Sequence, residues 1–314
     1  MAALFSKSVG RALTGASRAL AAAAAALALA GCGSALFFPS KQVPLTPRDL
    51  GLVYDDVDFA SSDGTKLHGW FLHARPIGPD PVPTVVFLHG NAGNVANHLG
   101  GAAWLPGQGF QVFLFDYRGF GLSEGNPDVQ SVHRDAVAAI RTVAARDDVD
   151  GDRIVAIGQS IGGAIALTAV ASVDGDVAVR ALVVDSAPSD FRGIAREKLA
   201  SFWLTWPLQY PLAWTVPAKP RPLDALAVLD GRRLLFIHGD RDSVVPPHHS
   251  FDLAAAIPGA ELLLVPGADH VQAFEKPWVQ KRVVSFLRSS LPAVRTDAIA
   301  LHSSHTQVGQ PPSR

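Results

Sequence analysis

The sequence predicts an α/β domain with a mostly parallel central sheet flanked by helices. From residue 84 onward, short apolar runs alternate with stretches of helical character, which is the pattern of βαβ units. Several runs are continuously apolar, as expected of strands covered on both faces. The predicted strands are 53–59, 66–73, 84–88, 111–115, 153–157, 180–184, 233–237 and 261–265, and the predicted helices are 95–108, 130–145, 161–173, 247–256 and 276–288.

A single domain over residues 52–291 accounts for these elements. The first two predicted strands have no helix between them, which favours a short antiparallel pair leading into the parallel sheet. The 314 residues, 48% of them hydrophobic, suffice for a sizeable core. Because 27 basic residues nearly balance 28 acidic ones, the composition does not indicate a nucleic-acid partner.

The first 31 residues have the layout of a signal peptide. Three basic residues precede an apolar run over 19–30, with no acidic residue before Cys32. The run is shorter than the roughly 20 residues that a membrane-spanning helix needs. We therefore expect residues 1–31 to be removed.

Cys32 ends this region in the sequence Leu29-Ala30-Gly31-Cys32, which resembles the lipobox of bacterial lipoproteins. It is the only cysteine, so no intramolecular disulfide can form in the oxidising compartment outside the cytoplasm. The resemblance implies a lipidated Cys32 that anchors the chain to the bacterial cell envelope. Gly33 and Ser34 provide no inner-membrane retention aspartate, which favours the outer membrane. The alternative is an ordinary signal peptide with an incidental cysteine.

Two terminal regions are expected to lie outside the packed domain. Residues 33–50 contain three prolines, which disfavour a regular helix, so 32–51 is predicted to be an extended tether. Residues 292–314 are polar and lack periodicity, so a disordered tail is predicted.

Residues 186–226 interrupt the alternation of strands and helices and are longer than a usual connection. Their aromatic residues and prolines predict a short aromatic-rich cap over the active site, whose lining favours an apolar or acyl substrate. The alternative is an irregular stretch with its aromatics packed onto the body. The aromatic residues are Phe202, Trp203, Trp206, Tyr210 and Trp214.

The motif Gly158-Gln159-Ser160-Ile161-Gly162 lies between a predicted strand and a predicted helix, which is the context of a nucleophile elbow. Its glycines permit a sharp turn that exposes the serine hydroxyl. The stretch 121–125 matches the same five-letter pattern but is followed by Asn-Pro-Asp, which is typical of a loop. Ser160 is therefore preferred to Ser123 as the nucleophile.

A serine nucleophile needs a base and an acid that orients the base. Asp242 and His270 each follow a predicted strand downstream of Ser160, giving the order serine, acid, histidine. Because the carboxyl ends of parallel strands meet at one edge of the sheet, we expect the three side chains to converge there. Asp240 is the rival for the acid.

These motifs resemble those of α/β-hydrolases over residues 52–290. The stretch His89-Gly90-Asn91-Ala92-Gly93-Asn94 is more specific, and resembles membrane-associated serine hydrolases acting on acyl esters, thioesters or lysophospholipids. The resemblance implies that Asp242 is the acid and that the backbone N–H groups of Asn91 and Ile161 form the oxyanion hole. The other matching stretches are 116–121, 158–162, 238–242 and 245–246.

The sequence therefore predicts a serine hydrolase of an acyl ester or thioester that uses an acyl-enzyme intermediate. The alternatives are a serine peptidase of the same fold and a non-catalytic envelope lipoprotein. The expected partners are an acyl substrate and a membrane; the oligomeric state stays open. This chemistry requires no cofactor. The pair His248 and His249 could bind zinc, but without a further ligand cluster in the sequence, surface histidines are preferred and no metal is predicted.

Overall fold

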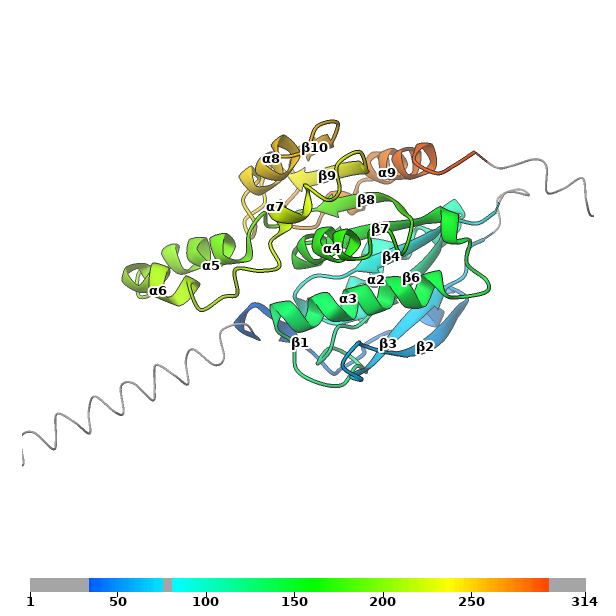
Figure 1. Cartoon of the computed structure of the whole chain (residues 1–314), viewed down its shortest axis with the longest axis horizontal. Coiled ribbons are helices and arrows are strands. Elements are labelled where there is room, and N and C mark those ends of the chain that lie inside the picture. Colours follow the sequence, from blue (N-terminus) through cyan, green and yellow to red (C-terminus); the bar gives the residue numbers. More distant parts are fainter. Residues whose placement is uncertain (1–33, 76–80, 294–314) are drawn as a thin grey trace, which may run out of the picture.

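The computed structural model describes residues 34–75 and 81–293, and it contains a central sheet of eight strands flanked by helices (Figure 1). This confirms the predicted fold class. The strands are β2 (Tyr54–Ala60), β3 (Lys66–Leu72), β4 (Thr84–Leu88), β6 (Gln111–Phe115), β7 (Ile154–Gln159), β8 (Val179–Asp185), β9 (Arg233–Gly239) and β10 (Glu261–Val265).

The sheet order is β10-β9-β8-β7-β4-β6-β3-β2. Neighbouring strands from β10 to β6 are parallel, whereas β3 pairs antiparallel with both β2 and β6. The predicted antiparallel pair is therefore present at one edge. The parallel strands direct their carboxyl ends to a single edge, where loops with functional side chains can meet.

Helices bury the apolar residues on both faces of the sheet. On β4, Val86 joins the core beneath α3 and α4, whereas Val85 and Phe87 join the core beneath α2 and α9. This alternation follows from the two-residue period of a strand. The helices outside the cap are α2 (Val95–Ala102), α3 (Val129–Ala144), α4 (Ile161–Ser172), α8 (His248–Ala255) and α9 (Pro277–Ser289).

The predicted helix 95–108 is shorter in the structure. The helix α2 ends at Ala102, and a separate 3-10 turn, Pro106–Gln108, follows. Pro106 lacks a backbone N–H and cannot continue the helical hydrogen bonds.

A cap connects β8 to β9. It consists of α5 (Phe191–Ala200), a 3-10 turn (Trp206–Leu208), α6 (Gln209–Ala213) and α7 (Pro222–Ala225). In Figure 1, α5 and α6 project to the left of the sheet. The cap begins with a capped helix, since the Asp190 side chain accepts a hydrogen bond from the Gly193 N–H.

The predicted tether differs from the structure, because residues 34–50 pack on the domain. A short strand β1 (Phe38–Pro39) pairs in parallel with β5 (Ala92–Gly93), and Phe37 is buried in the core. The Gly121 N–H also donates to the Ser40 carbonyl oxygen. The segment contains only two short 3-10 turns, Ser34–Leu36 and Pro47–Leu50, and no α-helix. Its backbone nevertheless forms hydrogen bonds with the domain, so the packed domain extends toward the N-terminus beyond residue 52.

The predicted signal peptide, Cys32 and most of the predicted tail lie outside the described residues. Within 34–75 and 81–293, no helix combines the length and hydropathy needed to cross a bilayer.

Candidate active site

Ser160 occupies the sharp turn between β7 and α4. Its backbone has φ 56° and ψ −128°, a conformation that L-residues rarely adopt. The turn is crowded, since a Cβ placed on Gly162 would lie 2.3 Å from the His89 carbonyl oxygen. Glycine is therefore required at position 162 for α4 to start so close to the end of β4.

The structure brings together the three side chains predicted to form the triad. The Ser160 Oγ lies 2.9 Å from His270 Nε2, and His270 Nδ1 lies 2.8 Å from Asp242 Oδ2. Ser160 follows β7, Asp242 follows β9 and His270 follows β10, so all three lie at the carboxyl edge of the sheet. A continuous path therefore exists for moving a proton from the serine hydroxyl to an oriented imidazole.

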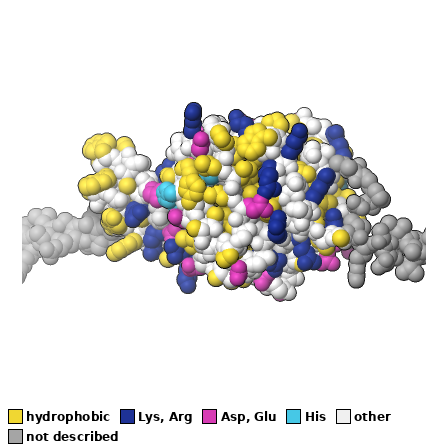
Figure 2. Space-filling model, turned by 90° about the horizontal axis from the view of Figure 1, so that it is seen from above, with side chains coloured by type: hydrophobic (Ala, Val, Ile, Leu, Met, Phe, Trp, Pro, Cys, Tyr) yellow, Lys and Arg dark blue, Asp and Glu magenta, His cyan; other side chains and the backbone are white. Residues whose placement is uncertain are grey.

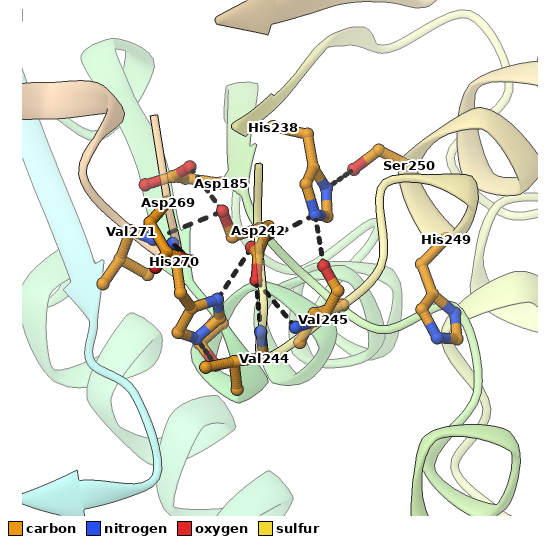
Figure 3. A network of polar contacts seen from close by, with 12 residues as sticks. Asp185, His238, Asp242, Val244, Val245, His249, Ser250, Asp269, His270 and Val271 are labelled. Atoms are coloured by element: carbon orange, nitrogen blue, oxygen red, sulfur yellow. Dashed lines mark hydrogen bonds and ion pairs between the residues drawn. The ribbon is translucent and has the colours of Figure 1, made fainter. Parts of the chain in front are cut away.

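The Asp242 carboxylate is fixed on both oxygens. Oδ1 accepts hydrogen bonds of 2.8 Å from the backbone N–H groups of Val244 and Val245. Oδ2 contacts His270 and a second histidine, His238, as Figure 3 shows. Burial alone would raise the pKa of Asp242, but hydrogen bonds from the two histidines outweigh it and hold this pKa well below its usual value. Asp242 is therefore ionised at neutral pH.

His238 is a supporting residue to which the sequence assigned no role. Its Nε2 lies 2.8 Å from the Val245 carbonyl oxygen and 3.2 Å from Asp242 Oδ2, so this nitrogen carries the proton. Nδ1 then accepts from the Ser250 hydroxyl. A fully buried histidine at the end of β9 thus positions the carboxylate, and its strand-end location was the available sequence signal.

The rival acid, Asp240, faces away from this network. Its Oδ1 accepts a 2.7 Å hydrogen bond from the Gly267 N–H, and the residue is exposed. Asp240 therefore supports the loop after β10, whereas Asp242 contacts His270.

Ser123 is buried, and its hydroxyl has a structural role. Its hydroxyl donates to the Asp116 carbonyl oxygen at 2.7 Å and accepts from the His68 N–H at 2.9 Å. The first contact ties the loop to the residue after β6 and the second ties it to β3, in agreement with the loop interpretation of this second motif.

Asn91 and Ile161, the predicted oxyanion-hole residues, line the same pocket as Ser160. Ile161 is the first residue of α4, so its N–H has no acceptor within the helix. Asn91 is held by the N-terminal segment, because its side chain donates to the Leu36 carbonyl oxygen and its own carbonyl oxygen accepts from the Phe38 N–H. Residues predicted to be a tether therefore support this loop.

The pocket beside Ser160 has a volume of about 360 Å³ and a mainly apolar lining. The cap contributes α5 residues, whereas the five aromatic residues expected to line the cap all lie outside this lining, each at least half exposed. The predicted cap is therefore present, but the prediction that its aromatic residues line the active site is wrong. The apolar lining residues include Leu36, Phe38, Ile194, Ala195, Val244 and Val245.

The structure confirms His248 as a surface histidine but changes this interpretation for His249. His249 is buried, and Glu197 of α5 lies 3.3 Å from Nε2 of each histidine, forming a group that could hold a metal ion. However, the Ser189 N–H donates to Nδ1 of His249, which leaves the proton on Nε2 facing Glu197. A metal-bound histidine normally donates through its other nitrogen. The arrangement therefore favours a hydrogen-bonded link between α5 and α8.

Asp185 is a second buried carboxyl group beside the triad. It ends β8, accepts a 2.9 Å hydrogen bond from Gln159 Nε2, and its carbonyl oxygen accepts from the Ser160 N–H. Burial raises the pKa of Asp185 to about 6, despite hydrogen bonds from Gln159 and Ser186 that lower it. The folded protein therefore holds this proton more tightly than the unfolded chain.

The Asp185→Asn substitution is expected to remove a pH dependence of stability. Because the folded pKa is raised, the favourable contribution of protonated Asp185 is present below about pH 4 and is lost as the pH rises through 6. Relative to Asp185→Asn, the wild-type free energy of unfolding should fall by about 2 kcal/mol between pH 4 and 7. Urea denaturation of both proteins at these pH values measures this; a constant difference would contradict it.

Comparison with known proteins agrees with this fold. A family model described as alpha/beta hydrolase fold matches residues 83–207, and one described as TAP-like protein matches residues 201–297. With a serine on the turn after β7 in an eight-stranded sheet, the class is that of the α/β-hydrolases. The chain belongs to this family, since it is 35% identical over 244 residues to the uncharacterized protein YfhR of Escherichia coli strain K12, covering 76% of this chain and 81% of YfhR.

The similar proteins also include a plant protein and solved esterase structures. The alpha/beta hydrolase domain-containing protein WAV2 of Arabidopsis thaliana is 34% identical, covering 67% of this chain and 68% of WAV2. Among solved structures, the Pyrococcus furiosus esterase Pf2001 matches with a TM-score of 0.64 and 26% identity over 82% of this chain and 98% of the esterase. An acetyl xylan esterase from Paenibacillus sp. R4 shares the fold at 21% identity, with a TM-score of 0.61, over 80% of this chain and 87% of that chain. The similarity to the Pyrococcus furiosus esterase suggests hydrolase activity.

Proposed function

We propose that this protein is a serine hydrolase that cleaves an acyl ester or thioester through an acyl-enzyme intermediate. The observation that carries the proposal is the hydrogen-bonded series from Ser160 through His270 to Asp242. The similarity to the Pyrococcus furiosus esterase supports the ester class.

In the proposed mechanism, His270 Nε2 takes the proton from the Ser160 hydroxyl as Oγ attacks the acyl carbon. Asp242 accepts the hydrogen bond from His270 Nδ1 and stabilises the imidazolium that forms. When the tetrahedral intermediate collapses, the imidazolium gives its proton to the leaving oxygen or sulfur. A water molecule then attacks the acyl-enzyme with the same histidine as base, and the acid product and free Ser160 result.

The negative charge on the tetrahedral oxygen needs donors that are already oriented. The Ile161 N–H at the start of α4 and the Asn91 N–H are proposed for this role. Their common pocket and the anchoring of the Asn91 loop by residues 36 and 38 support the assignment. Donors held by the fold avoid the free energy of reorganisation during the reaction.

The mainly apolar pocket supports an acyl group as the bound portion of the substrate. Lys198 is the charged residue in its lining, and its Nζ lies 3.3 Å from the Ser243 carbonyl oxygen. The Lys198 side chain therefore adds a positive charge to a mainly apolar pocket.

We also propose that Cys32 is lipidated and that the chain is anchored at the cell envelope, with outer-membrane placement favoured. The apolar run 19–30 and the sequence that follows it support this. Few residues separate the proposed lipid anchor from the domain, because residues 34–40 already belong to the domain.

Fluorophosphonate labelling tests the proposed chemistry, because this reagent modifies only activated serines. We expect wild-type protein and the Ser123→Ala variant to be labelled and Ser160→Ala to remain unlabelled. Folded wild-type protein without label would favour the non-catalytic lipoprotein. Label retained on Ser160→Ala would place the nucleophile elsewhere. Turnover of acyl esters, thioesters and peptides by untreated wild-type protein then separates the substrate classes.

A further inference from the structure

The cap carries a concentrated apolar surface. Between residues 202 and 214, seven large hydrophobic side chains have exposed fractions from 51% to 76%, and the stretch 201–214 contains no charged residue. Three of the seven are Trp203, Trp206 and Trp214. In Figure 2, hydrophobic side chains gather at the left end of the molecule, where the cap projects. An apolar patch of this kind typically marks an interaction surface.

This cap surface is next to the proposed catalytic pocket. The helix α6 contacts α5, and the α5 residues Ile194, Ala195 and Lys198 line the pocket that contains Ser160. A partner lying on the cap would therefore lie close to the entrance through which a substrate reaches the serine.

The N-terminal segment lines the same pocket. Leu36 and Phe38 belong to its lining, and Phe38 is 62% exposed. In the sequence, Cys32 is two residues before Ser34. The apolar run 19–30 precedes it. Attachment of this segment to a bilayer therefore brings the membrane to the pocket, which selects a bilayer as the occupant of the cap surface.

The residue types suit a lipid interface. Trp and Tyr rings combine an apolar body with a hydrogen-bonding group, and they concentrate at the boundary between acyl chains and headgroups. The adjacent helix α5 carries Arg192, Arg196 and Lys198 but one acidic residue, Glu197. Basic groups beside an apolar patch favour the anionic surface of a phospholipid membrane.

We propose that residues 202–214 of the cap insert into the headgroup region of an anionic phospholipid bilayer, so that the pocket beside Ser160 takes its acyl substrate from the membrane. The docking rests on the proposed membrane anchoring, and the origin of the substrate rests on the proposed hydrolase function. The bilayer covers the exposed aromatics, and the substrate enters between α5 and the N-terminal segment.

Tryptophan quenching tests the docking directly. Full-length protein is reconstituted in phosphatidylcholine–phosphatidylglycerol vesicles with and without brominated acyl chains, which quench indole emission on contact. We expect strong quenching in the wild type and loss of most of it in the triple variant Trp203→Phe/Trp206→Phe/Trp214→Phe. The Trp278→Phe variant is the matched control, because Trp278 is also exposed but lies at the start of α9.

The outcomes separate docking from anchoring and from catalysis. Palmitate labelling that is lost in Cys32→Ser reports the anchor alone, and fluorophosphonate labelling reports Ser160 alone. Protein that floats with the vesicles but shows equal quenching in the wild type and the triple variant would overturn the docking. The same holds if the cap tryptophans are instead covered by a second copy of the chain, which cross-linking in the vesicles detects.

A second pair of variants tests the origin of the substrate. We expect Trp203→Asp/Trp206→Asp to lower turnover of an acyl lipid held in vesicles, while turnover of a soluble short-chain ester stays at the wild-type level. Neither tryptophan lines the pocket beside Ser160. An equal loss on both substrates, or no loss on either, would contradict delivery from the membrane.

Discussion

Replacing His270 with alanine is expected to lower kcat for acyl ester hydrolysis by about 10⁶, which is the loss seen when the base of a serine–histidine pair is removed. The imidazole Nε2 lies 2.9 Å from the Ser160 hydroxyl, and within the described residues no other side-chain base contacts that hydroxyl. Without His270, the serine must attack as a neutral alcohol. Steady-state kinetics with an activated acyl ester measures the loss.

The matched control is His73→Ala. His73 is another partly exposed histidine with a carboxylate partner, 3.0 Å from Asp55, but it lies at the end of β3 on the antiparallel edge of the sheet. It should retain wild-type turnover. Circular dichroism and the urea midpoint establish that His270→Ala is folded. Turnover within tenfold of the wild type in a folded His270→Ala protein would remove this histidine from the mechanism.

The sheet could be predicted from sequence because most of its strands are recognisable from their own residues alone. Buried parallel strands such as β4 and β7 need apolar residues on both faces, so they stand out as short apolar runs. The convergence of Ser160, Asp242 and His270 could be predicted because each residue follows a strand of the parallel sheet, whose carboxyl ends meet at one edge. Chain order and strand ends were sufficient for Ser160 and His270, whereas the choice of Asp242 over Asp240 came from the resemblance to α/β-hydrolases. The role of His238 required the side-chain contacts.

The N-terminal segment could not be predicted in this way. Its place depends on backbone hydrogen bonds to the loop 91–94, such as that from the Phe38 N–H to the Asn91 carbonyl oxygen, and backbone groups carry no sequence signature. The prolines in the segment correctly indicated that it forms no α-helix, but they did not exclude packing on the domain. The polar Asn94 side chain, which donates to the Ser40 and Gln42 carbonyl oxygens, completes the contact.

The short helices of the cap and the exposure of its aromatic residues could not be predicted for different reasons. Helices of five and four residues, α6 and α7, are too short to show a helical period. Aromatic residues are usually assigned to the interior, so their exposure at Trp203 and Trp206 was not expected. A surface that contradicts the ordinary burial preference is the basis of the membrane docking proposed for this cap.

The Asp242→Asn substitution is expected to lower kcat by about 10⁴ while leaving the fold intact. An asparagine keeps the shape and one oxygen acceptor, but it no longer carries the charge that stabilises the His270 imidazolium. It can also present an N–H to His270 Nδ1, which selects the tautomer with a proton on Nε2, the nitrogen that must accept from Ser160. The matched control is Asp240→Asn, which retains an acceptor for the Gly267 N–H and should keep wild-type kcat. If Asp240→Asn loses activity and Asp242→Asn does not, the acid is Asp240 and the network around His238 serves only stability.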